Sequence, residues 1–258
     1  MKRKTKRWIC SFLTVGLVLT GMVPAQAYTK PQEAEEILQG GYAKDEQAYQ
    51  IYPIPQSVDY EPGEFQITQE VNIVCEDGID TYTKAFLEEI LEKYGRTVTE
   101  SSSAVSGKSN ILLGTDGSDQ AAVQWSALHS SIEDDQLFDR TDAYFLDAEN
   151  GDVAIIGKDT DAVYCGLATL QMMFSSFAGD RFLNVEIEDY ADMAVRGFIE
   201  GFYGGWDYPS RESLMRFARD FKMNTYVYAS KTDPYHTSGT LYPQSQINQI
   251  RELVKVGK

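Results

Sequence analysis

Residues 196–206 read RGFIEGFYGGW, and this stretch decides the fold of the C-terminal part of the chain. Apolar residues recur from Met193 to Ile199, and the run stops at Glu200 before a glycine-rich segment, as a short buried strand ends in a loop. A second run, NTYVYA from 224 to 229, follows after one helix and ends in SKTDPYH. Parallel strands joined by a helix, with polar residues at their C-terminal ends, predict the opening of a (β/α) barrel, whose active sites lie at that end.

The first 27 residues have the composition of a secretory leader. Basic residues precede an apolar core from Trp8 to Val23, and Ala25, Gln26 and Ala27 form a small-residue cleavage site. The apolar run is short for a membrane span, which needs roughly 20 residues, so cleavage after Ala27 is favoured over an uncleaved anchor. We therefore expect a protein that is secreted or held at the cell surface.

The chain is acidic, with a formal net charge of −16 at pH 7, and the leader removes further positive charge. Nucleic-acid binding requires clusters of Lys and Arg on the surface, so the composition excludes a nucleic-acid partner. The acidic residues are interpreted as a solvated surface. They would repel a polyanionic ligand, so an uncharged or cationic ligand is bound more easily.

Cysteine and histidine usage indicates neither a metal site nor a cofactor. Cys10 leaves with the leader, so Cys75 and Cys165 remain. They could form one disulfide in an exported protein, but a strand-like and a helical apolar context favour two buried free thiols. The sequence has no CxxC pair, and its two histidines are far apart, so a structural zinc is not expected.

Residues 28–50 are polar and are predicted to be a linker, whereas residues 51–190 are predicted to form a small α/β domain of sandwich-like layering, a sheet with helices on one face. Strand-like positions occur between Phe65 and Val74 and again from Val98. A helix is predicted from an N-cap at Asp80 through Tyr94, with Gly95 as its stop.

The second half of this domain repeats the pattern. NILLG at 110–114 predicts a buried strand, and 143–147 with 152–157 predicts a hairpin that turns across 148–151. Asp159 or Thr160 then caps a helix whose apolar stripe runs from Val163 to Phe177. We interpret this stripe as a face packed on the sheet rather than as a cofactor pocket.

The two strand-end motifs carry a resemblance to a known family. RGFIEGFYG, followed by NTYVYASKTDPYH and then YP, resembles the start of the catalytic barrel of glycoside hydrolase family 84. Members of that family are β-N-acetylglucosaminidases, including the O-GlcNAcases and bacterial enzymes often named hyaluronidases. The resemblance implies that residues 191–258 begin a (β/α)8 TIM barrel, and that the partner is a glycan or glycoprotein containing N-acetylglucosamine.

The helical stretch before the barrel carries a second resemblance. GKDTDAVYCGLATLQMMF, from 157 to 174, is similar to the GxDxxGxxYGLxTLxQ element of the α/β domain that precedes the barrel in hexosaminidases of families 20 and 84. Ala162 and Cys165 depart from the commoner pattern. That domain is not the catalytic part of those enzymes, so its residues inherit no chemistry.

The family 84 resemblance assigns roles to a few residues. Gly197 is predicted at the end of the first barrel strand, where it would offer a backbone contact to the sugar, although a purely packing reason for this glycine stays open. Lys231 matches a substrate-binding lysine, whose ammonium group donates to sugar hydroxyls. Supporting roles are expected for Glu200, Tyr203, Asp233 and His236. The loop aromatics could form a sugar platform or plug the barrel mouth.

Catalysis in family 84 is substrate-assisted: the acetamido oxygen of the sugar attacks the anomeric carbon, and two adjacent aspartates orient it and transfer the proton. The resemblance places this aspartate pair beyond Lys258, so no catalytic residue is expected in this chain. The pair Asp134–Asp135 precedes the barrel and cannot replace the missing aspartate pair.

A closed barrel needs ~250 residues. We expect the isolated chain to be inactive and residues 195–258 to fold poorly alone. The alternative is a non-catalytic carbohydrate-binding or surface-interaction protein.

Overall fold

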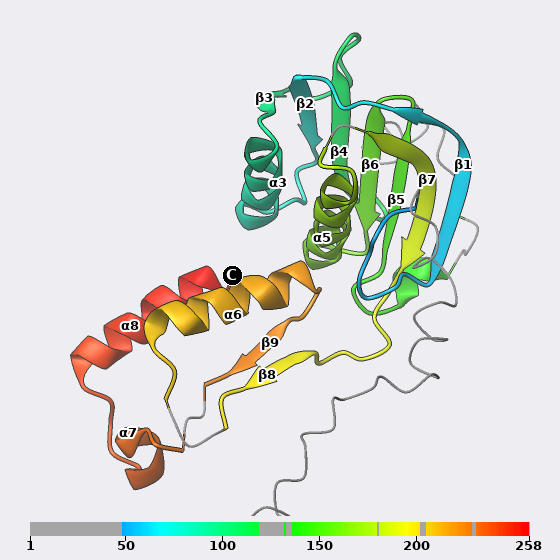
Figure 1. Ribbon diagram of the computed structural model, residues 1–258. Coiled ribbons are helices and arrows are strands. Elements are labelled where there is room, and N and C mark those ends of the chain that lie inside the picture. Colours follow the sequence, from blue (N-terminus) through cyan, green and yellow to red (C-terminus); the bar gives the residue numbers. More distant parts are fainter. Residues whose placement is uncertain are drawn as a thin grey trace, which may run out of the picture. The chain divides into compact units, whose positions relative to one another are not determined.

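A computed structural model describes residues 48–118, 132, 136–179, 181–201, 205–228 and 231–257, without the side chains of 236 and 237. The leader and most of the predicted linker lie outside these residues. The described chain consists of an α/β domain and a smaller C-terminal part, residues 191–257, which we call the barrel start after the prediction above (Figure 1). No helix within the described ranges is long and apolar enough to cross a membrane.

The α/β domain is built on one seven-stranded sheet with strand order β1-β7-β5-β6-β4-β2-β3. Strands β3, β2, β4 and β6 run parallel to one another, whereas β5, β7 and β1 pair antiparallel. Its elements are β1 (Ser57–Phe65), β2 (Glu70–Cys75), α3 (Thr81–Lys93), β3 (Thr97–Glu100), β4 (Ser109–Thr115), η2 (Leu137–Asp139), β5 (Tyr144–Glu149), β6 (Asp152–Gly157), α5 (Thr160–Ser176) and β7 (Phe182–Asp189).

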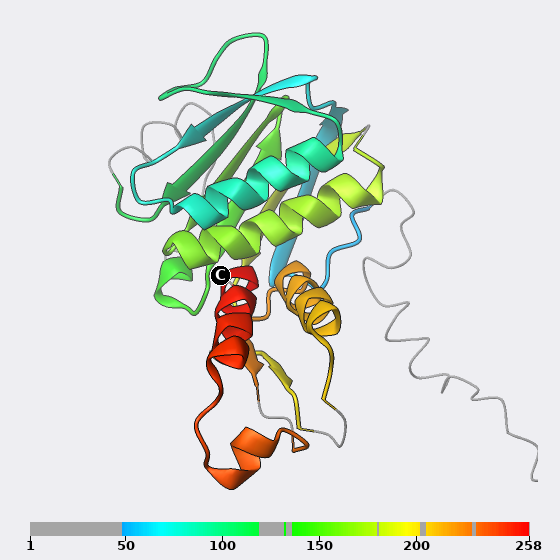
Figure 2. The same ribbon diagram turned by 90° about the vertical axis from the view of Figure 1, so that its left-hand side faces the viewer.

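Both predicted helices of this domain are confirmed. The Asp80 carboxylate accepts from the Thr83 N–H to cap α3, and the Asp159 carboxylate accepts from the Ala162 N–H to cap α5. Helices α3 and α5 lie across the same face of the sheet (Figures 1 and 2). The largest buried apolar cluster lies between them and the sheet, so the expected layering of a sheet with helices on one face is confirmed.

The predicted hairpin is confirmed, but its turn is shorter than expected. Strands β5 and β6 pair through Glu149 and Asp152, which leaves only Asn150 and Gly151 in the loop. Both loop residues have positive φ, 54° and 98°, which a two-residue type I′ turn requires and which Asn and Gly adopt at low cost.

The domain boundary lies earlier than the predicted linker end at residue 50. Ala48 and Tyr49 are buried, and the Tyr49 hydroxyl donates to the Leu183 carbonyl of β7 and accepts from the Leu183 N–H. Strand β7 was not predicted, although its alternation of buried apolar and half-buried acidic residues is the pattern of a strand with one buried face. The chain before β1 therefore belongs to the folded domain from residue 48 onward.

The barrel start has two parallel strands separated by a helix, as predicted. Its elements are β8 (Gly197–Ile199), α6 (Tyr208–Asp220), β9 (Thr225–Val227), α7 (Pro234–Ser238) and α8 (Gln244–Val256). Strands β8 and β9 form a separate two-stranded sheet in which Gly197 pairs with Thr225. The described residues thus contain the opening of a βα pattern and not a closed barrel.

The first barrel strand is shorter than the apolar run predicted. Strand β8 begins at Gly197, and Met193 and Val195 are exposed. The reason is the Asn224 side chain, which accepts from the Arg196 N–H and donates to the Ala194 carbonyl. This amide takes the hydrogen bonds that a longer strand ladder would have used.

Cys75 and Cys165 are free thiols, but both are half-buried rather than buried as predicted. Burial raises the pKa of Cys75 to about 11 and that of Cys165 to about 12. In the described part of the chain, His, Cys, Asp and Glu side chains form no group that could hold a metal ion.

Candidate functional site

The loops that follow β8 and β9 emerge at the same edge of the two-stranded sheet, because the strands are parallel. Glu200 and Gly201 follow β8 directly, and Tyr228 follows β9. These two loops are the candidate functional site. They carry all the residues to which the sequence gives a sugar-related role, except Gly197.

Glu200 is the polar centre of the first loop. Its side chain is buried, and its two oxygens receive a bidentate contact from Arg211 on α6, with Nη2 at 2.6 Å from Oε1 and Nε at 2.9 Å from Oε2. The Tyr226 hydroxyl donates to Oε2 at 2.7 Å, and the Trp206 N–H donates to Oε1 at 3.2 Å. One carboxylate therefore ties the end of β8 to α6 and to β9.

These contacts determine the ionisation of Glu200. Burial disfavours the charged form, but hydrogen bonds from Arg211, Tyr226 and the Trp206 N–H outweigh it and hold the pKa of the carboxyl below its usual value. The pKa of Tyr226 is raised by burial and by its bond to Glu200. An ionised carboxylate held by several donors is a poor general acid near neutral pH.

Asp233 organises the second loop in a similar way. It is buried, and it accepts from the Tyr235 N–H at 2.9 Å, from the Tyr228 hydroxyl at 3.3 Å and from the Gln246 side chain on α8 at 3.2 Å. These bonds fix the chain where α7 begins. Lys231 lies in the same loop and is exposed.

One stacking contact joins the two loops. The Arg211 guanidinium, which binds Glu200, lies 4.7 Å from the centre of the Tyr228 ring, and Tyr228 in turn donates to Asp233. Glu200 and Asp233 are therefore connected through Arg211 of α6 and Tyr228, which follows β9. Buried polar contacts of Glu200 and Asp233 hold the two loops in place, while Lys231 is exposed at the surface of the site.

Gly197 does not lie where the sequence argument put it. It starts β8 rather than ending it, and the sites of parallel α/β units form at the other end of the strands. A Cβ added at Gly197 would lie 1.7 Å from the Thr225 carbonyl oxygen, so close strand packing explains this glycine. Its sugar contact stays a prediction. Gly201, in contrast, follows the strand, and a Cβ there would meet nothing within 4 Å.

Several predicted site residues fall outside the described structure. Tyr203 and the pair Asp134–Asp135 lie beyond the described ranges, and only the backbone of His236 is described, within α7. The roles given to them stay predictions.

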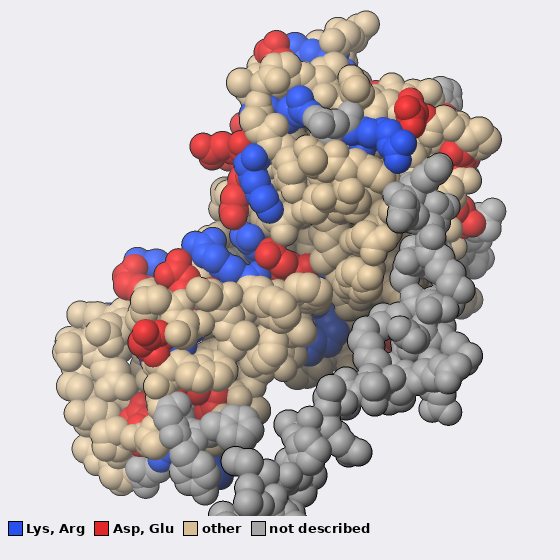
Figure 3. All heavy atoms as spheres, in the orientation of Figure 1, with Lys and Arg blue, Asp and Glu red and all other residues tan. Residues whose placement is uncertain are grey.

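Sequence reasoning missed Arg211 and Gln246, the helix residues that hold the two buried carboxylates. A signal for Arg211 exists, because a buried Glu needs a cation, and the following helix is the nearest element that can supply one. On the face shown in Figure 3, basic side chains are interspersed with acidic ones.

Comparisons with known proteins divide the chain at the same place as the structure. A family model described as glycosyl hydrolase family 20, domain 2, matches residues 48–190, and one described as beta-N-acetylglucosaminidase matches residues 196–258. The solved structure of CpGH84D is 36% identical with a TM-score of 0.76, covering 82% of this chain and 36% of that chain. For CpGH84B the values are 26%, 0.66, 81% and 35%.

A more distant solved structure has the same fold. The exo beta-N-acetylglucosaminidase of glycoside hydrolase family 20 from Vibrio harveyi, in complex with N-acetylglucosamine, is 16% identical, with a TM-score of 0.56. That match covers 80% of this chain and 34% of that chain. The chain thus spans about a third of the length of these solved relatives.

Proposed function

The chain belongs to the hexosaminidase-type glycoside hydrolases, whose family 20 domain 2 model covers residues 48–190, and from this premise we propose that it is the N-terminal part of a family 84 β-N-acetylglucosaminidase. The complete protein would remove terminal β-linked N-acetylglucosamine from a glycan or glycoprotein, with retention of configuration. The observation that carries this proposal is the braced pair of loops after β8 and β9, within residues 196–258 that match the beta-N-acetylglucosaminidase model.

The proposed role of this chain in the reaction is to bind the sugar. Lys231 is a flexible cation with three donors, and its loop is fixed by the buried Asp233, so it can bind hydroxyls of a terminal sugar at a defined place. Glu200 fixes the loop after β8 through its contact with Arg211 of α6.

The chemical step would be supplied by the sugar itself and by residues beyond this chain. In the proposed mechanism the acetamido oxygen attacks the anomeric carbon, the glycosidic bond breaks, and an oxazoline forms, which water then opens. An adjacent aspartate pair would orient the acetamido group and transfer the proton to and from the leaving oxygen. We further propose that the protein is exported by its leader.

The first experiment reads the coding DNA beyond codon 258 and expresses the longest reading frame. Turnover of an aryl β-N-acetylglucosaminide is expected from that product, and Lys231→Ala is expected to lower kcat/KM by roughly 10- to 100-fold, since the loss of a charge-assisted contact weakens binding. Lys255→Ala is the matched control, because Lys255 is an exposed lysine on α8 and should leave turnover unchanged.

Residues 28–258 alone are expected to show no turnover. Turnover by this shorter chain, or an unchanged kcat/KM in Lys231→Ala, would contradict the assignment of roles. A frame that ends at codon 258, together with N-acetylglucosamine binding that Lys231→Ala abolishes, would favour a carbohydrate-binding protein instead.

A further inference from the structure

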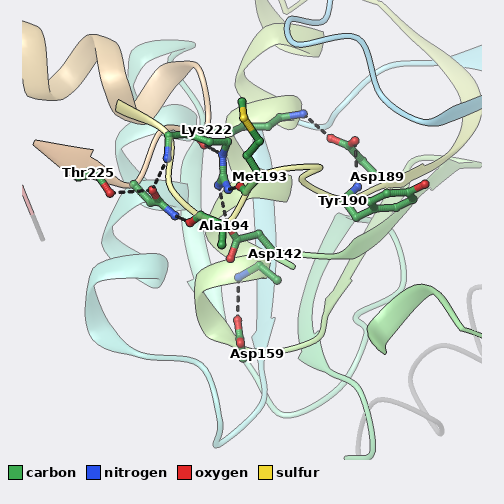
Figure 4. Close-up of polar contacts among 11 residues, drawn as sticks. Asp142, Asp159, Asp189, Tyr190, Met193, Ala194, Lys222 and Thr225 are labelled. Carbon is green, nitrogen blue, oxygen red and sulfur yellow. Dashed lines mark hydrogen bonds and ion pairs between the residues drawn. The ribbon is translucent and has the colours of Figure 1, made fainter. Parts of the chain in front are cut away.

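Among the described residues, three ion pairs of one polarity join the barrel start to the α/β domain. In each pair the barrel start supplies the cation and the α/β domain supplies the carboxylate. The pairs are Arg196 with Asp142, Arg219 with Glu89, and Lys222 with Asp189. Figure 4 shows Lys222 directed toward Asp189. Such charge complementarity fixes register between two surfaces.

The Lys222 pair is the most buried of the three, with side-chain exposures of 8% for Lys222 and 10% for Asp189. The Lys222 ammonium donates to Asp189 Oδ2 at 2.8 Å and to the Tyr144 hydroxyl at 2.9 Å. Tyr144 donates to the same carboxylate and shares a hydrogen bond with Thr169 of α5. The lysine thus joins a buried polar cluster of the α/β domain.

Apolar packing is sparse around this contact. A cavity of about 500 Å³ opens beside the pair, lined by residues of both parts, including Asp80, Asp142, Thr225 and Gly257. Within the described barrel start, only Ala218 and Leu253 are buried apolar residues. The orientation of the barrel start therefore depends on the ion pairs more than on a shared core.

Lys222 lies where it can fix both strands. It follows the last turn of α6 in a left-handed conformation, with φ of 56°, and precedes β9. Its carbonyl accepts from Arg196 Nε at 3.0 Å, and the Arg196 carbonyl accepts from the N–H groups of Asn224 and Thr225. The starts of β8 and β9 are hydrogen-bonded to each other next to the lysine.

We propose that the α/β domain holds the first two strands of the barrel, β8 and β9, in position. Lys222 is the positioning residue of this contact. The rival explanation is local: Lys222 would serve only to neutralise the buried Asp189, with no effect on the strands beyond it. The proposal does not depend on the sugar chemistry proposed above.

Hydrogen exchange of the whole chain, followed by mass spectrometry, separates the two explanations. Lys222→Met is expected to accelerate exchange in residues 197–227 by tenfold or more, while peptides of β4 and β6 change by less than twofold. Lys222→Arg should restore part of the protection. Lys255→Met is the control, because that exposed lysine pairs with Glu252 within α8. Unchanged exchange in 197–227, or equal acceleration throughout the chain, would overturn the proposal.

A double variant removes the charge left behind by the single one. In Lys222→Met/Asp189→Asn no uncompensated carboxylate remains, so the local explanation predicts wild-type exchange in 197–227. Our proposal predicts that exchange in 197–227 stays fast in the double variant. If Lys222→Met does not fold, Tyr144→Phe replaces it, since it removes one partner of Lys222 and keeps the ring. Fast exchange confined to 197–227 would again support the proposal, and wild-type exchange there would overturn it.

Discussion

The two parts of this molecule are held together by different interactions. Nearly all described buried apolar residues precede residue 190, and only Ala218 and Leu253 follow it. Most of the large exposed apolar residues, in contrast, lie in the barrel start: Met193, Val195, Ile199, Trp206, Phe217, Val227, Leu241 and Val254. The first part thus has the core of an independent domain, whereas the second is organised by polar contacts.

Strand geometry explains the difference. The strands of the α/β domain have up to nine residues, and all seven belong to one sheet with two helices packed on it, whereas β8 and β9 have three residues each. An isolated two-stranded sheet is marginally stable in water. The barrel start therefore needs its buried ions, Glu200 with Arg211 and Lys222 with Asp189, to remain ordered.

The largest expected effect comes from the core of the α/β domain. Phe174→Ala should lower the free energy of unfolding by about 3–5 kcal/mol, because this buried ring packs on Phe182 and Tyr94 and leaves a cavity. Phe217→Ala on α6, where the ring is half exposed, should cost far less. Denaturant unfolding measures both. Equal losses would mean that the two parts share one core.

The next test concerns strand packing in the barrel start. Gly197→Ala should cost about 1–3 kcal/mol of local stability, because its Cβ would overlap the Thr225 carbonyl and separate β8 from β9. Gly201→Ala is the control, since its Cβ meets open space. Amide exchange of Phe198 and Val227 by NMR reports the pairing. Retained protection in Gly197→Ala would contradict the packing explanation.

Glu200 gives a pH-dependent test of the same region. Because its pKa is lowered by Arg211 and Tyr226 in the fold, the ionised form stabilises the loop at pH above ~4.3, the unfolded value, and this contribution disappears as pH falls through the folded pKa. The Trp206 amide shift, followed by NMR, should report the transition. Glu200→Gln should abolish it and cost about 1.5 kcal/mol locally. A transition that persists in the variant would assign it to another carboxyl.

The smallest effect is expected at the thiols. With pKa values of about 11 and about 12, Cys75 and Cys165 hold roughly one thiolate in a thousand or fewer at pH 8, so iodoacetamide should modify the folded chain slowly. Both lie in the α/β domain. Gly197→Ala should leave the rate unchanged, while Phe174→Ala should raise it. Faster alkylation in Gly197→Ala would show that the two parts open together.

The sequence by itself determined the elements whose signals are local. Asp80 and Asp159 cap helices, Asn150–Gly151 turns a hairpin, and apolar runs mark β4 and β9, because each depends on residues only a few positions apart. The position of Lys231 in a strand-end loop followed from the same local pattern. The motifs of both parts also carried the family resemblance, and the family comparisons bear out the hexosaminidase-type glycoside hydrolase.

Only the tertiary structure decided the contacts between distant residues. It showed that Asn224 ends the ladder of β8 early, that Gly197 packs on Thr225, and that Tyr49 belongs to the core. It also paired Glu200 with Arg211, and Lys222 with Asp189 and Tyr144. The physical reason is that a lone charge in a sequence does not identify its partner: burial makes a partner necessary, and the fold alone brings one within hydrogen-bonding distance.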